Sequence, residues 1–399
     1  MTESRLEDLP GDRGIFGLQW EGKKAAATTA STPTVATLDP EPDKSVDWVG
    51  TQNVFVEGDN LDALKALAVE YAGAVKVVYA DPPYNTGHSF VYADDFSADT
   101  GHRRADWASM MYPRLLLARD LLRGDGSLML SIGDEEAAPL RLLLDEVFGA
   151  DNHAATFAVV RAEGGGLAKQ VVRGHDYLLV YAKDIRKLAP LRRPKEIRGQ
   201  VVTWQGEDHW IEEDWLRRRF GAYGTCEYAE IEEFHGPRKR AEVEEGLVDG
   251  RYRLLEKKDG RVLVGRLRKV AADSSKFHSV QKHLNKDAAA DFAEIGMPVV
   301  FDFPKPVSLI SDLVLGATFH SKDDGDVMLD FFAGSGTTGH AVLRRNARDG
   351  GNRRYVLVQR PEPLLDDSAS HRAAAQFCVE NGLGANLAEL TRERLRRRN

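Results

Sequence analysis

The stretch YADPPYNTG (residues 79–87) ends a buried apolar run, VKVV at 75–78, with an acid, two prolines and a tyrosine. Proline donates no backbone N–H group to a sheet, so the strand has to stop at this point. A turn needs only an aspartate and one proline, and the fixed order at residues 81–84 therefore requires another explanation. For this motif taken alone, the simple alternative is a proline-stiffened surface turn.

The residues around this stretch alternate between strand and helix patterns. NVFVEGDN (53–60) has the pattern of a strand, and apolar residues at helical spacing follow it. VKVVYA (75–80) is apolar on both faces, as expected of a parallel strand covered by helices on both sides. The same criteria predict a helix at 106–123 that is perturbed at Pro113, a strand at 127–132, a helix at 139–148, and strands at 155–160 and 177–182.

This alternation is lost after about residue 185 and returns at 326. Between these points, residues 251–286 contain eleven basic and three acidic residues. They include YRLLEKKDGRVLVG, two β-rich runs around Asp259-Gly260, which predict a hairpin. The simplest interpretation is one α/β domain in two pieces, with a basic, β-rich insert between them.

We therefore predict four segments along the chain. Residues 1–45 are rich in Ala, Thr, Pro and Asp and are expected to be loosely ordered. Residues 46–184 form the half of the domain that carries DPPY, 185–295 form the insert, and 296–399 form the second half with the C-terminal tail.

A second motif, DFFAGSGTTGH (330–340), consists of a strand end, a glycine-rich turn and a helix start. Gly334 and Gly336 let the backbone approach a ligand, and the free amides of a helix N-terminus favour negative groups. A phosphate-clamping ATPase loop would need Gly-Lys-Ser/Thr where this chain has Gly339-His340. A dinucleotide-binding loop and a tight turn without a ligand both remain open for this motif alone.

Composition limits the remaining classes of function. The formal charge is −8, so binding of nucleic acid has to depend on local patches. The two cysteines, Cys226 and Cys378, lack metal-ligand spacing and indicate free thiols in a reducing compartment. Neither a secretory start nor an apolar run of the ~18 residues that a membrane helix needs is found. We expect a cytoplasmic protein without a metal site.

Taken together, the two motifs resemble those of the DNA amino-methyltransferase family. The order, with DPPY first and the glycine loop last, resembles the permuted β class, and in particular the modification subunits of type III restriction systems. The resemblance covers roughly residues 50–185 and 295–360. The runs that carry it are VEGDNLDALKAL, VVYADPPYNTGHSFVYADDF, MMYPRLLLARDLLRGDGSLMLSIGDEE, HDYLLVYAKD, FDFPKPVSLI and MLDFFAGSGTTGHAV.

This resemblance implies a class I S-adenosylmethionine-dependent methyltransferase fold, with a mostly parallel, circularly permuted, Rossmann-like sheet. The insert would then be a target-recognition domain. The implied activity is transfer of a methyl group from S-adenosylmethionine to N6 of adenine in double-stranded DNA after base flipping. A second copy of the chain and a separate restriction subunit are optional further partners. Any restriction activity would need another chain, because no helicase or nuclease signature is present.

The chemistry explains the opening stretch as a clamp for a base. An exocyclic amine is a poor nucleophile because its lone pair is delocalised into the ring. If Asp81 and a carbonyl of Pro82-Pro83 accept its two N–H bonds, the nitrogen is held with its lone pair toward the methyl donor. Tyr84 offers a ring on which the base can stack, which is worth ~1–3 kcal/mol.

On the cofactor side, the resemblance implies that Asp330 meets the amino group of S-adenosylmethionine, Asp59 its adenine ring and Lys305 its carboxylate. The residues that would line its methionine portion are Ala333, Gly334, Ser335, Gly336 and Thr337. The aspartates could instead merely cap helices. Many relatives place an acid for the ribose hydroxyls at the end of the next strand, where this chain has Gln359, with Glu362 three residues on.

The two basic stretches, 186–198 and 251–269, the second with Arg266, Arg268 and Lys269, are expected to contact DNA phosphates, although such runs can also be ordinary solvated faces. Two other functions stay open. The same clamp suits the N4 amine of cytosine, although cytosine enzymes of the family more often have Ser in place of the first Asp. A catalytically silent DNA- or nucleotide-binding module is the alternative from a different class.

Overall fold

The structure, a computed structural model, describes residues 17–87, 103–164, 170–219, 224–364 and 369–399. The chain divides into two compact units. Arg192–Lys276 forms one unit, and the flanking segments Met1–Leu191 and Phe277–Asn399 together form the other.

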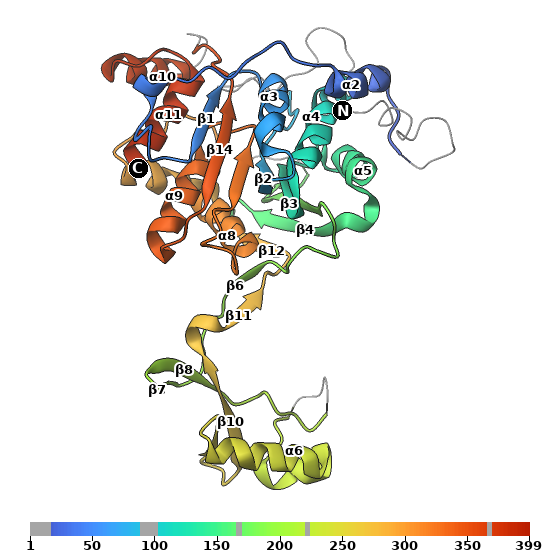
Figure 1. The fold of residues 1–399 in the computed structure, drawn as a ribbon, viewed down its shortest axis with the longest axis vertical. Coiled ribbons are helices and arrows are strands. Elements are labelled where there is room, and N and C mark those ends of the chain that lie inside the picture. The colour runs from blue at the N-terminus through green and yellow to red at the C-terminus, as the bar shows by residue number, and fades with distance from the viewer. Residues whose placement is uncertain (1–16, 88–102, 165–169, 220–223, 365–368) are drawn as a thin grey trace. The chain divides into compact units, whose positions relative to one another are not determined.

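The larger unit is built on an eight-stranded sheet (Figure 1). All neighbouring strands are parallel except β5, which is antiparallel to both of its neighbours. In spatial order the strands are β1 (Val54–Glu57), β14 (Arg354–Gln359), β13 (Val327–Asp330), β2 (Val75–Ala80), β3 (Leu122–Ile132), β5 (His175–Ala182), β4 (His153–Val160) and β12 (Val280–Lys282).

Helices cover both faces of this sheet (Figure 1). Val78 and Ala80 of β2 pack on the side of α2, α3, α4 and α5, whereas Val77 and Tyr79 pack on the side of α8 and α9. Because successive side chains of a strand point to opposite faces, the run VKVVYA presents apolar side chains to both faces, as predicted. The exception is the buried Lys76, which pairs with Asp125 at 2.7 Å. The helices of this unit are α2 (Lys23–Ser31), α3 (Asn60–Tyr71), α4 (Arg103–Leu121), α5 (Ala137–Phe148), α7 (Ala288–Glu294), α8 (Val307–Ala317), α9 (Thr337–Asp349), α10 (Ala369–Glu380) and α11 (Leu387–Arg398). Helix α4 runs through Pro113 without a break.

The chain reverses direction across the sheet between β13 and β2. After β13, helix α9 leads to β14 on one side, whereas after β2, helix α4 leads to β3 on the other side. Such a reversal opens a crevice at the carboxyl ends of the two strands, where ligands bind in open α/β sheets. Asp330 ends β13 beside Tyr79 of β2. Asp81 follows two residues after Tyr79 along the chain. The sheet therefore brings both predicted motifs to one crevice. It confirms the predicted, mostly parallel α/β fold. The strand before the glycine loop, β13, comes late in the chain but lies inside the sheet, next to β2.

The described part of the N-terminal segment, residues 17–45, contains a docked helix that we did not predict. Within residues 17–45 the chain forms α2, whose Ala26 and Ala27 are buried. Trp20 Nε1 donates to Ser109 Oγ of α4 at 2.8 Å, and Lys23 pairs with Glu146 of α5 at 2.7 Å. A composition rich in alanine and threonine therefore does not prevent this segment from docking on the sheet's helical layer.

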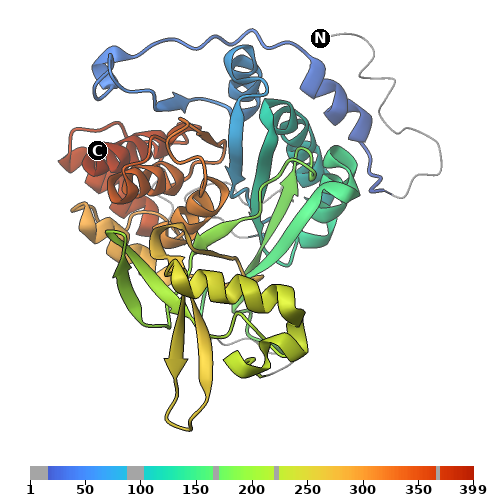
Figure 2. The same ribbon diagram turned by 60° about the horizontal axis from the view of Figure 1, so that its bottom comes forward.

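The smaller unit has its own sheets and core (Figure 2). The predicted hairpin at Asp259-Gly260 is confirmed as the antiparallel pair β9–β10. We did not predict the helix α6 (Ile231–Val248), which is kinked at Gly236-Pro237. Stacked rings of Trp215 and Tyr252, 5.0 Å apart, lie in its core. The elements are β7 (Val201–Trp204), β8 (Glu207–Glu212), β10 (Val262–Lys269) and β9 (Tyr252–Glu256) in one sheet, β6 (Arg192–Pro194) and β11 (Ser274–Lys276) in another, and α6 (Ile231–Val248).

The insert is shorter than the predicted 185–295. Residues 277–295 belong to the larger unit, because β12 pairs in parallel with β4 and Phe292 of α7 is fully buried in a cluster with α10 and α11. Short 3₁₀ turns join other elements: η1 (Pro42–Lys44), η2 (Ala150–Asn152), η3 (Tyr228–Glu230), η4 (Val270–Ala272) and η5 (Asn285–Asp287). In the part of the chain that the structure describes, every helix is too short or too polar to cross a membrane.

The docking of α2 predicts a difference between two neighbouring substitutions. Ala27→Glu places a charge in the buried contact, so the free energy of unfolding should fall by roughly 1–3 kcal/mol. Ala25→Glu, on the exposed side of the same helix, should change it by less than about 0.5 kcal/mol. Urea unfolding of both variants measures this, and equal stabilities would contradict docking of α2.

Candidate active site at the carboxyl edge of the sheet

Asp81 lies where β2 ends, at the centre of the crevice. Its Oδ1 is 3.1 Å from Lys305 Nζ in an ion pair. That oxygen is buried, and none of the described residues gives it a well-aligned hydrogen bond. Loss of solvent raises the pKa of Asp81, and the nearby Lys305 ammonium opposes this rise. The carboxylate therefore retains capacity to accept hydrogen bonds from a ligand.

The two proline carbonyls of DPPY have different surroundings. Trp107, a fully buried side chain of α4, donates its Nε1–H to the Pro83 carbonyl at 2.8 Å. This bond fixes the loop from behind and leaves Pro82 as the better candidate for a carbonyl that accepts from a ligand. Sequence analysis missed Trp107, because only the packing of α4 on the loop shows what its indole contacts.

Tyr84 is held at both its ring and its hydroxyl. A Cβ atom on Gly133, which follows β3, would lie 2.9 Å from Tyr84 Cδ2, so glycine is needed for this close approach. Lys305 Nζ donates to the Tyr84 hydroxyl at 2.8 Å, and that hydroxyl lies 3.4 Å from Asp176 Oδ2. The ring therefore has a fixed position, which a stacking platform requires.

The residue after DPPY anchors the loop in a buried polar network. Asn85 is fully buried and has a positive φ of 58°, a backbone region that asparagine tolerates. Its side chain donates to Glu136 Oε1 at 2.7 Å and accepts from Arg103 Nε at 2.8 Å. Glu136, at the start of α5, is itself buried, and its contact with Asn85 gives the buried carboxylate a hydrogen-bond donor.

The glycine loop has the conformation that its sequence requires. Gly334 and Gly336 have φ values of 50° and 76°, which side chains other than glycine rarely adopt. A Cβ on Gly334 would meet no atom closer than 3.8 Å, so this residue is open to a ligand. Gln359, at the end of β14, accepts from Gly334 N at 2.7 Å and thereby fixes the loop. Gln359 lies where the resemblance implied an acid for the ribose hydroxyls. In this chain its side chain instead holds the glycine loop.

The C-terminal helix α11 supports this loop from the other side. Arg394 is fully buried, and its Nη1 donates to Ser335 O at 3.0 Å, Ser335 Oγ at 2.8 Å and Thr337 Oγ1 at 3.1 Å. The Thr391 hydroxyl donates to Gly334 O at 2.5 Å. The side chains of Ser335 and Thr337 are therefore engaged within the protein. The basic run RERLRRRN (392–399) gave no signal that one of its arginines is internal, except that Leu395 and Thr391 share its helical face.

Asp330 is an almost fully buried acid, 2% exposed. It accepts from Thr338 Oγ1 at 2.6 Å and from Phe332 N at 3.0 Å. Desolvation nevertheless raises its pKa to about 7. A cationic group in the crevice would stabilise the ionised form, so this position suits an ammonium ligand.

Two of the predicted cofactor contacts have other partners. Asp59 caps α3, because its Oδ1 accepts from Leu61 N at 2.9 Å, and its Oδ2 lies 3.7 Å from Arg114. Its side chain is 42% exposed, so the capping role leaves it accessible. Lys305 points to Asp81 and Tyr84, on the DPPY side of the crevice. Ala333 is buried and its N–H donates to Val358 O at 3.1 Å.

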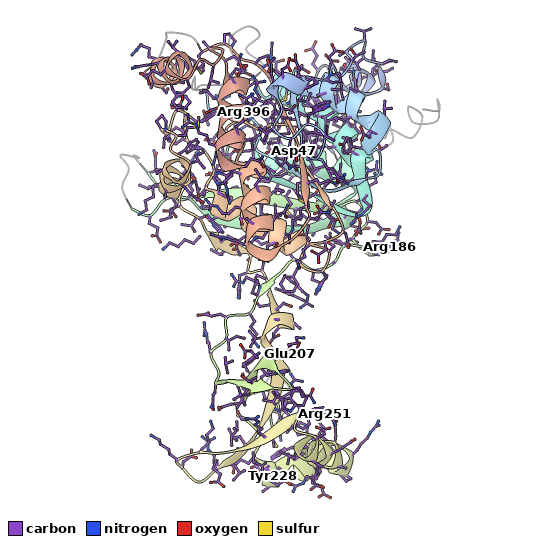
Figure 3. All side chains as sticks on the ribbon, turned by 60° about the vertical axis from the view of Figure 1, so that its left-hand side comes forward. Asp47, Arg186, Glu207, Tyr228, Arg251 and Arg396 are labelled. Atoms are coloured by element: carbon purple, nitrogen blue, oxygen red, sulfur yellow. The ribbon has the colours of Figure 1, made fainter. Side chains whose placement is uncertain are left out.

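The three cations predicted to contact DNA lie on β10 in the smaller unit, and each is ion-paired there. The pairs are Arg266 with Glu212 (2.6 Å), Arg268 with Asp273 (2.7 Å) and Lys269 with Glu207. Figure 3 labels Glu207 and also Arg251, which pairs with Asp249 at 2.5 Å. Two acids of β8, Glu207 and Glu212, and Asp273 after η4 thus largely neutralise the cations of β10.

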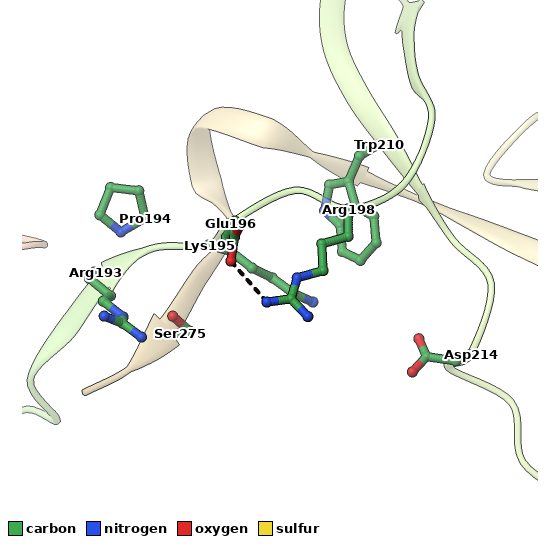
Figure 4. A pocket seen from close by; sticks show the side chains of 8 residues that line it. All are labelled: Arg193, Pro194, Lys195, Glu196, Arg198, Trp210, Asp214 and Ser275. Carbon is green, nitrogen blue, oxygen red and sulfur yellow. Dashed lines mark hydrogen bonds and ion pairs between the residues drawn. The ribbon is translucent and has the colours of Figure 1, made fainter. Parts of the chain in front are cut away.

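Other cations of the same unit line a cavity of about 730 Å³ beside β6 (Figure 4). Lys195 Nζ lies 4.2 Å from the centre of the Trp210 ring. Arg198, whose side chain is 85% exposed, pairs with the similarly exposed Glu196 at 3.0 Å. The charged and aromatic residues of the lining are Arg193, Lys195, Glu196, Arg198, Trp210 and Asp214.

Comparison with known proteins agrees with this geometry. A family model described as DNA methylase matches residues 75–359. The Mod subunit of the type III restriction-modification enzyme EcoP15I of Escherichia coli is 27% identical over 98% of this chain and 70% of its own length. The Mod subunit of StyLTI of Salmonella typhimurium is 29% identical over 96% of this chain and 62% of its own length. This chain thus spans about two thirds of the length of these relatives.

Among solved structures, the PvuII DNA methyltransferase (cytosine-N4-specific) aligns with 85% of this chain and 99% of its own, at 12% identity and a TM-score of 0.43. A likeness at this level does not bear on the reaction or on the target base.

The burial of Asp330 predicts a pH-dependent cost in stability. Its folded-state pKa of about 7 lies above the ordinary 3.8, so the cost is absent below about pH 4, grows as pH rises, and is complete above about pH 7. Asp330→Asn should therefore raise the free energy of unfolding by roughly 2–4 kcal/mol at pH 8, and the gain should largely vanish at pH 4. Urea unfolding at both pH values measures this, with the exposed Asp323→Asn as control. A variant less stable than the parent at pH 8 would contradict the assigned burial.

Proposed function

The chain belongs to the DNA methylase family, and from this premise we propose that it is a site-specific methyltransferase acting on N6 of adenine in double-stranded DNA. S-adenosylmethionine is the proposed methyl donor. The observation that carries the proposal is the crevice between β13 and β2, where the Asp81 carboxylate and the glycine loop with Asp330 meet. The register of the sheet supports the proposal, because it brings a carboxylate next to a loop that is open to a ligand.

In the proposed reaction, Asp81 and the Pro82 carbonyl accept the two N–H groups of the target amine. Held in this way, the nitrogen becomes more tetrahedral and its lone pair is directed across the crevice. Because both acceptors are fixed before the base arrives, catalysis consists mostly of positioning and electrostatics. Trp107 and the Asn85 network keep the loop in place, which makes the acceptor geometry independent of the substrate.

The residues around the glycine loop fit S-adenosylmethionine. When bound, it supplies an electrophilic methyl group on a sulfonium sulfur. Asp330 would hold its ammonium group, since a buried acid with a pKa of about 7 is stabilised in its charged form by a cation. The open face at Gly334 would admit its methionine portion, and the accessible Asp59 remains the proposed contact for its adenine ring.

The target base has to leave the duplex to reach Asp81. Tyr84, fixed by Gly133 and Lys305, would stack on the flipped base, and stacking of ~1–3 kcal/mol offsets part of a flipping cost of a few kcal/mol. N4 of cytosine is the second candidate target, because the same two acceptors suit any exocyclic amine. The aspartate at position 81 favours adenine, by the resemblance described above.

The smaller unit is the proposed target-recognition domain. Its cavity beside β6 brings together three cations and one aromatic ring, and Arg198 there is 85% exposed, whereas the ion-paired cations of β10 are 36–44% exposed. Lys195 shares Glu212 and Asp273 with the β10 arginines, at 3.6 and 4.0 Å. We therefore place the phosphate contacts at Arg193, Lys195 and Arg198, and assign the β10 cations mainly to stability. Of the two basic stretches expected from the sequence to contact phosphates, this proposal keeps 186–198 and releases 251–269.

The relatives also bear on partners. Two of them are Mod subunits of type III restriction-modification enzymes, which favours a separate restriction subunit as a partner of this chain. A homodimer and a cytoplasmic location remain predictions.

The base clamp predicts a selective loss of activity. Asp81→Asn keeps the size of the side chain but removes one acceptor and the charge, so methyl transfer should fall at least about 100-fold, while S-adenosylmethionine binding changes less than about threefold. Mass spectrometry of nucleosides from treated DNA measures the product, and equilibrium dialysis measures binding. Asp184→Asn is the matched control, because Asp184 lies two residues after the end of β5 and pairs with Arg186. Parental activity in Asp81→Asn would exclude the clamp.

The two groups of cations predict different salt dependences of DNA binding. Replacing Arg193, Lys195 and Arg198 by glutamine should weaken binding and reduce the slope of log K against log salt by about 2.7, since each of the three phosphate contacts contributes about 0.9. The same change at Arg266, Arg268 and Lys269 should leave the slope nearly unchanged but lower stability. Fluorescence anisotropy at several salt concentrations measures both. If the β10 variant lowers the salt slope and the cavity variant leaves it unchanged, β10 is the DNA contact instead.

A further inference from the structure

Lys305, which the resemblance assigned to the cofactor carboxylate, points to the DPPY side of the crevice. Its Nζ is 2.8 Å from the Tyr84 hydroxyl, 3.1 Å from Asp81 Oδ1 and 3.7 Å from Asp176 Oδ2. The side chain is only 12% exposed, so these three oxygens form much of its polar surroundings. Two of its neighbours belong to DPPY, and the third, Asp176, begins β5 and has no role in the reaction proposed above.

From this geometry we propose that Lys305 and Asp176 are a positioning pair for the base clamp: Lys305 keeps Asp81 ionised in the empty site and turns to Asp176 when the target amine takes its place at Asp81. The inference rests on the proposed function, since it assigns Asp81 to an amine. It adds two residues that act on the substrate only through Asp81 and Tyr84.

The need for such a pair follows from what Asp81 has to do. Loss of solvent favours its neutral form, and a protonated carboxyl group has lost one of its acceptor positions. A lysine 3.1 Å away restores the charge, but it also competes with the amine for Oδ1. The lysine therefore has to be present before the substrate and has to move aside afterwards.

Asp176 makes this movement inexpensive in free energy. A buried ammonium that loses its only carboxylate is strongly destabilised, whereas one with a second carboxylate nearby stays paired. Asp176 Oδ2 already lies within 4 Å of Nζ, and lysine has three N–H donors to share among its neighbours. Lys305 can thus strengthen one pair as it weakens the other, while its bond to Tyr84 keeps the stem in place.

Asp176 is itself held for this purpose. It is mostly buried, and its Oδ1 lies 2.8 Å from Arg161 Nε, which follows β4. The antiparallel direction of β5 brings its first residues to the edge where the parallel strands end, beside Asp81. Arg161 and Lys305 thus balance Asp81 and Asp176. The other titratable or charged groups facing this site are Tyr79, Tyr84 and Asp330.

The two residues should shift the acid limb of the pH–rate profile in opposite directions. Lys305→Met removes the cation that lowers the pKa of Asp81, so the limb should move up by about 1–3 pH units. Asp176→Asn removes a like charge, so the limb should move down by about one unit. Asp176→Asn also leaves Lys305 with Asp81 alone, so KM for DNA should rise about tenfold at neutral pH. A purely structural role would lower activity at every pH without moving the limb.

The experiment measures the pH profile of kcat/KM for DNA, and the affinity for S-adenosylmethionine without DNA, in the full chain. Lys305→Arg should restore the limb, and Lys282→Met, a surface lysine paired with Glu163, is the control. Opposite shifts with unchanged cofactor affinity support the pair. Loss of cofactor affinity in Lys305→Met with no shift of the limb would overturn it and return Lys305 to the cofactor carboxylate.

A readout that does not need activity separates this inference from the proposed function. The ¹³C-carboxyl resonance of Asp81 can be titrated in the parent and in the variants, and its absence in Asp81→Asn identifies it. If Lys305→Met does not fold, the double variant Lys305→Met/Asp176→Asn, which loses one positive and one negative charge, takes its place. Shifts of the expected sign support the pair even if the parent methylates no DNA, which would contradict the proposed function alone. An Asp81 pKa that is unchanged in both single variants, or in the double variant and in Asp176→Asn, would overturn the pair.

Discussion

The parallel pairing of β13 with β2 is the constraint on which the rest of this molecule depends. Asp330 lies beside Tyr79 across this pair, so the glycine loop and DPPY emerge within two residues of each other at the same edge. The chain leaves β13 toward β14 and leaves β2 toward β3, and the crevice between them follows from that divergence alone. The two motifs are separated by about 250 residues in sequence, and only the sheet brings them together.

A second theme is the control of buried charge at this edge. Asp330 is buried, and within the described residues its side chain is held by neutral donors, Thr338 and the Phe332 amide. Its raised pKa marks it as a site that a positively charged ligand would stabilise. Asp81 has a lysine beside it, and that lysine has a second carboxylate in Asp176. Around these groups, neutral contacts hold the loops: the indole of Trp107 on Pro83 and the side chain of Gln359 on Gly334. The reacting groups can therefore respond to ligands while the backbone that presents them stays fixed.

Sequence alone could predict what local chemistry determines. DPPY, the glycine loop and the hairpin at Asp259-Gly260 are short motifs whose residue types fix their backbone, and these were found. What it could not predict depends on contacts between distant segments. Arg266 pairs with Glu212 because β10 lies against β8 in one register, and no composition count shows that register. Arg394 lies beneath Ser335, 59 residues earlier, and the end of the insert is set by β12 pairing with β4. Lys305 was given a cofactor role by resemblance, and only the three oxygens around its Nζ indicate another.

Single-molecule sequencing of DNA from cells that carry this gene, compared with cells that lack it, addresses the proposed reaction most directly. It reports the modified base, its strand and its sequence context in one measurement. An enzyme with a base clamp at Asp81 and a separate recognition unit should leave N6-methyladenine at one defined sequence throughout the genome. Unmodified DNA, or N4-methylcytosine at the marked sites, would contradict adenine methylation by this chain.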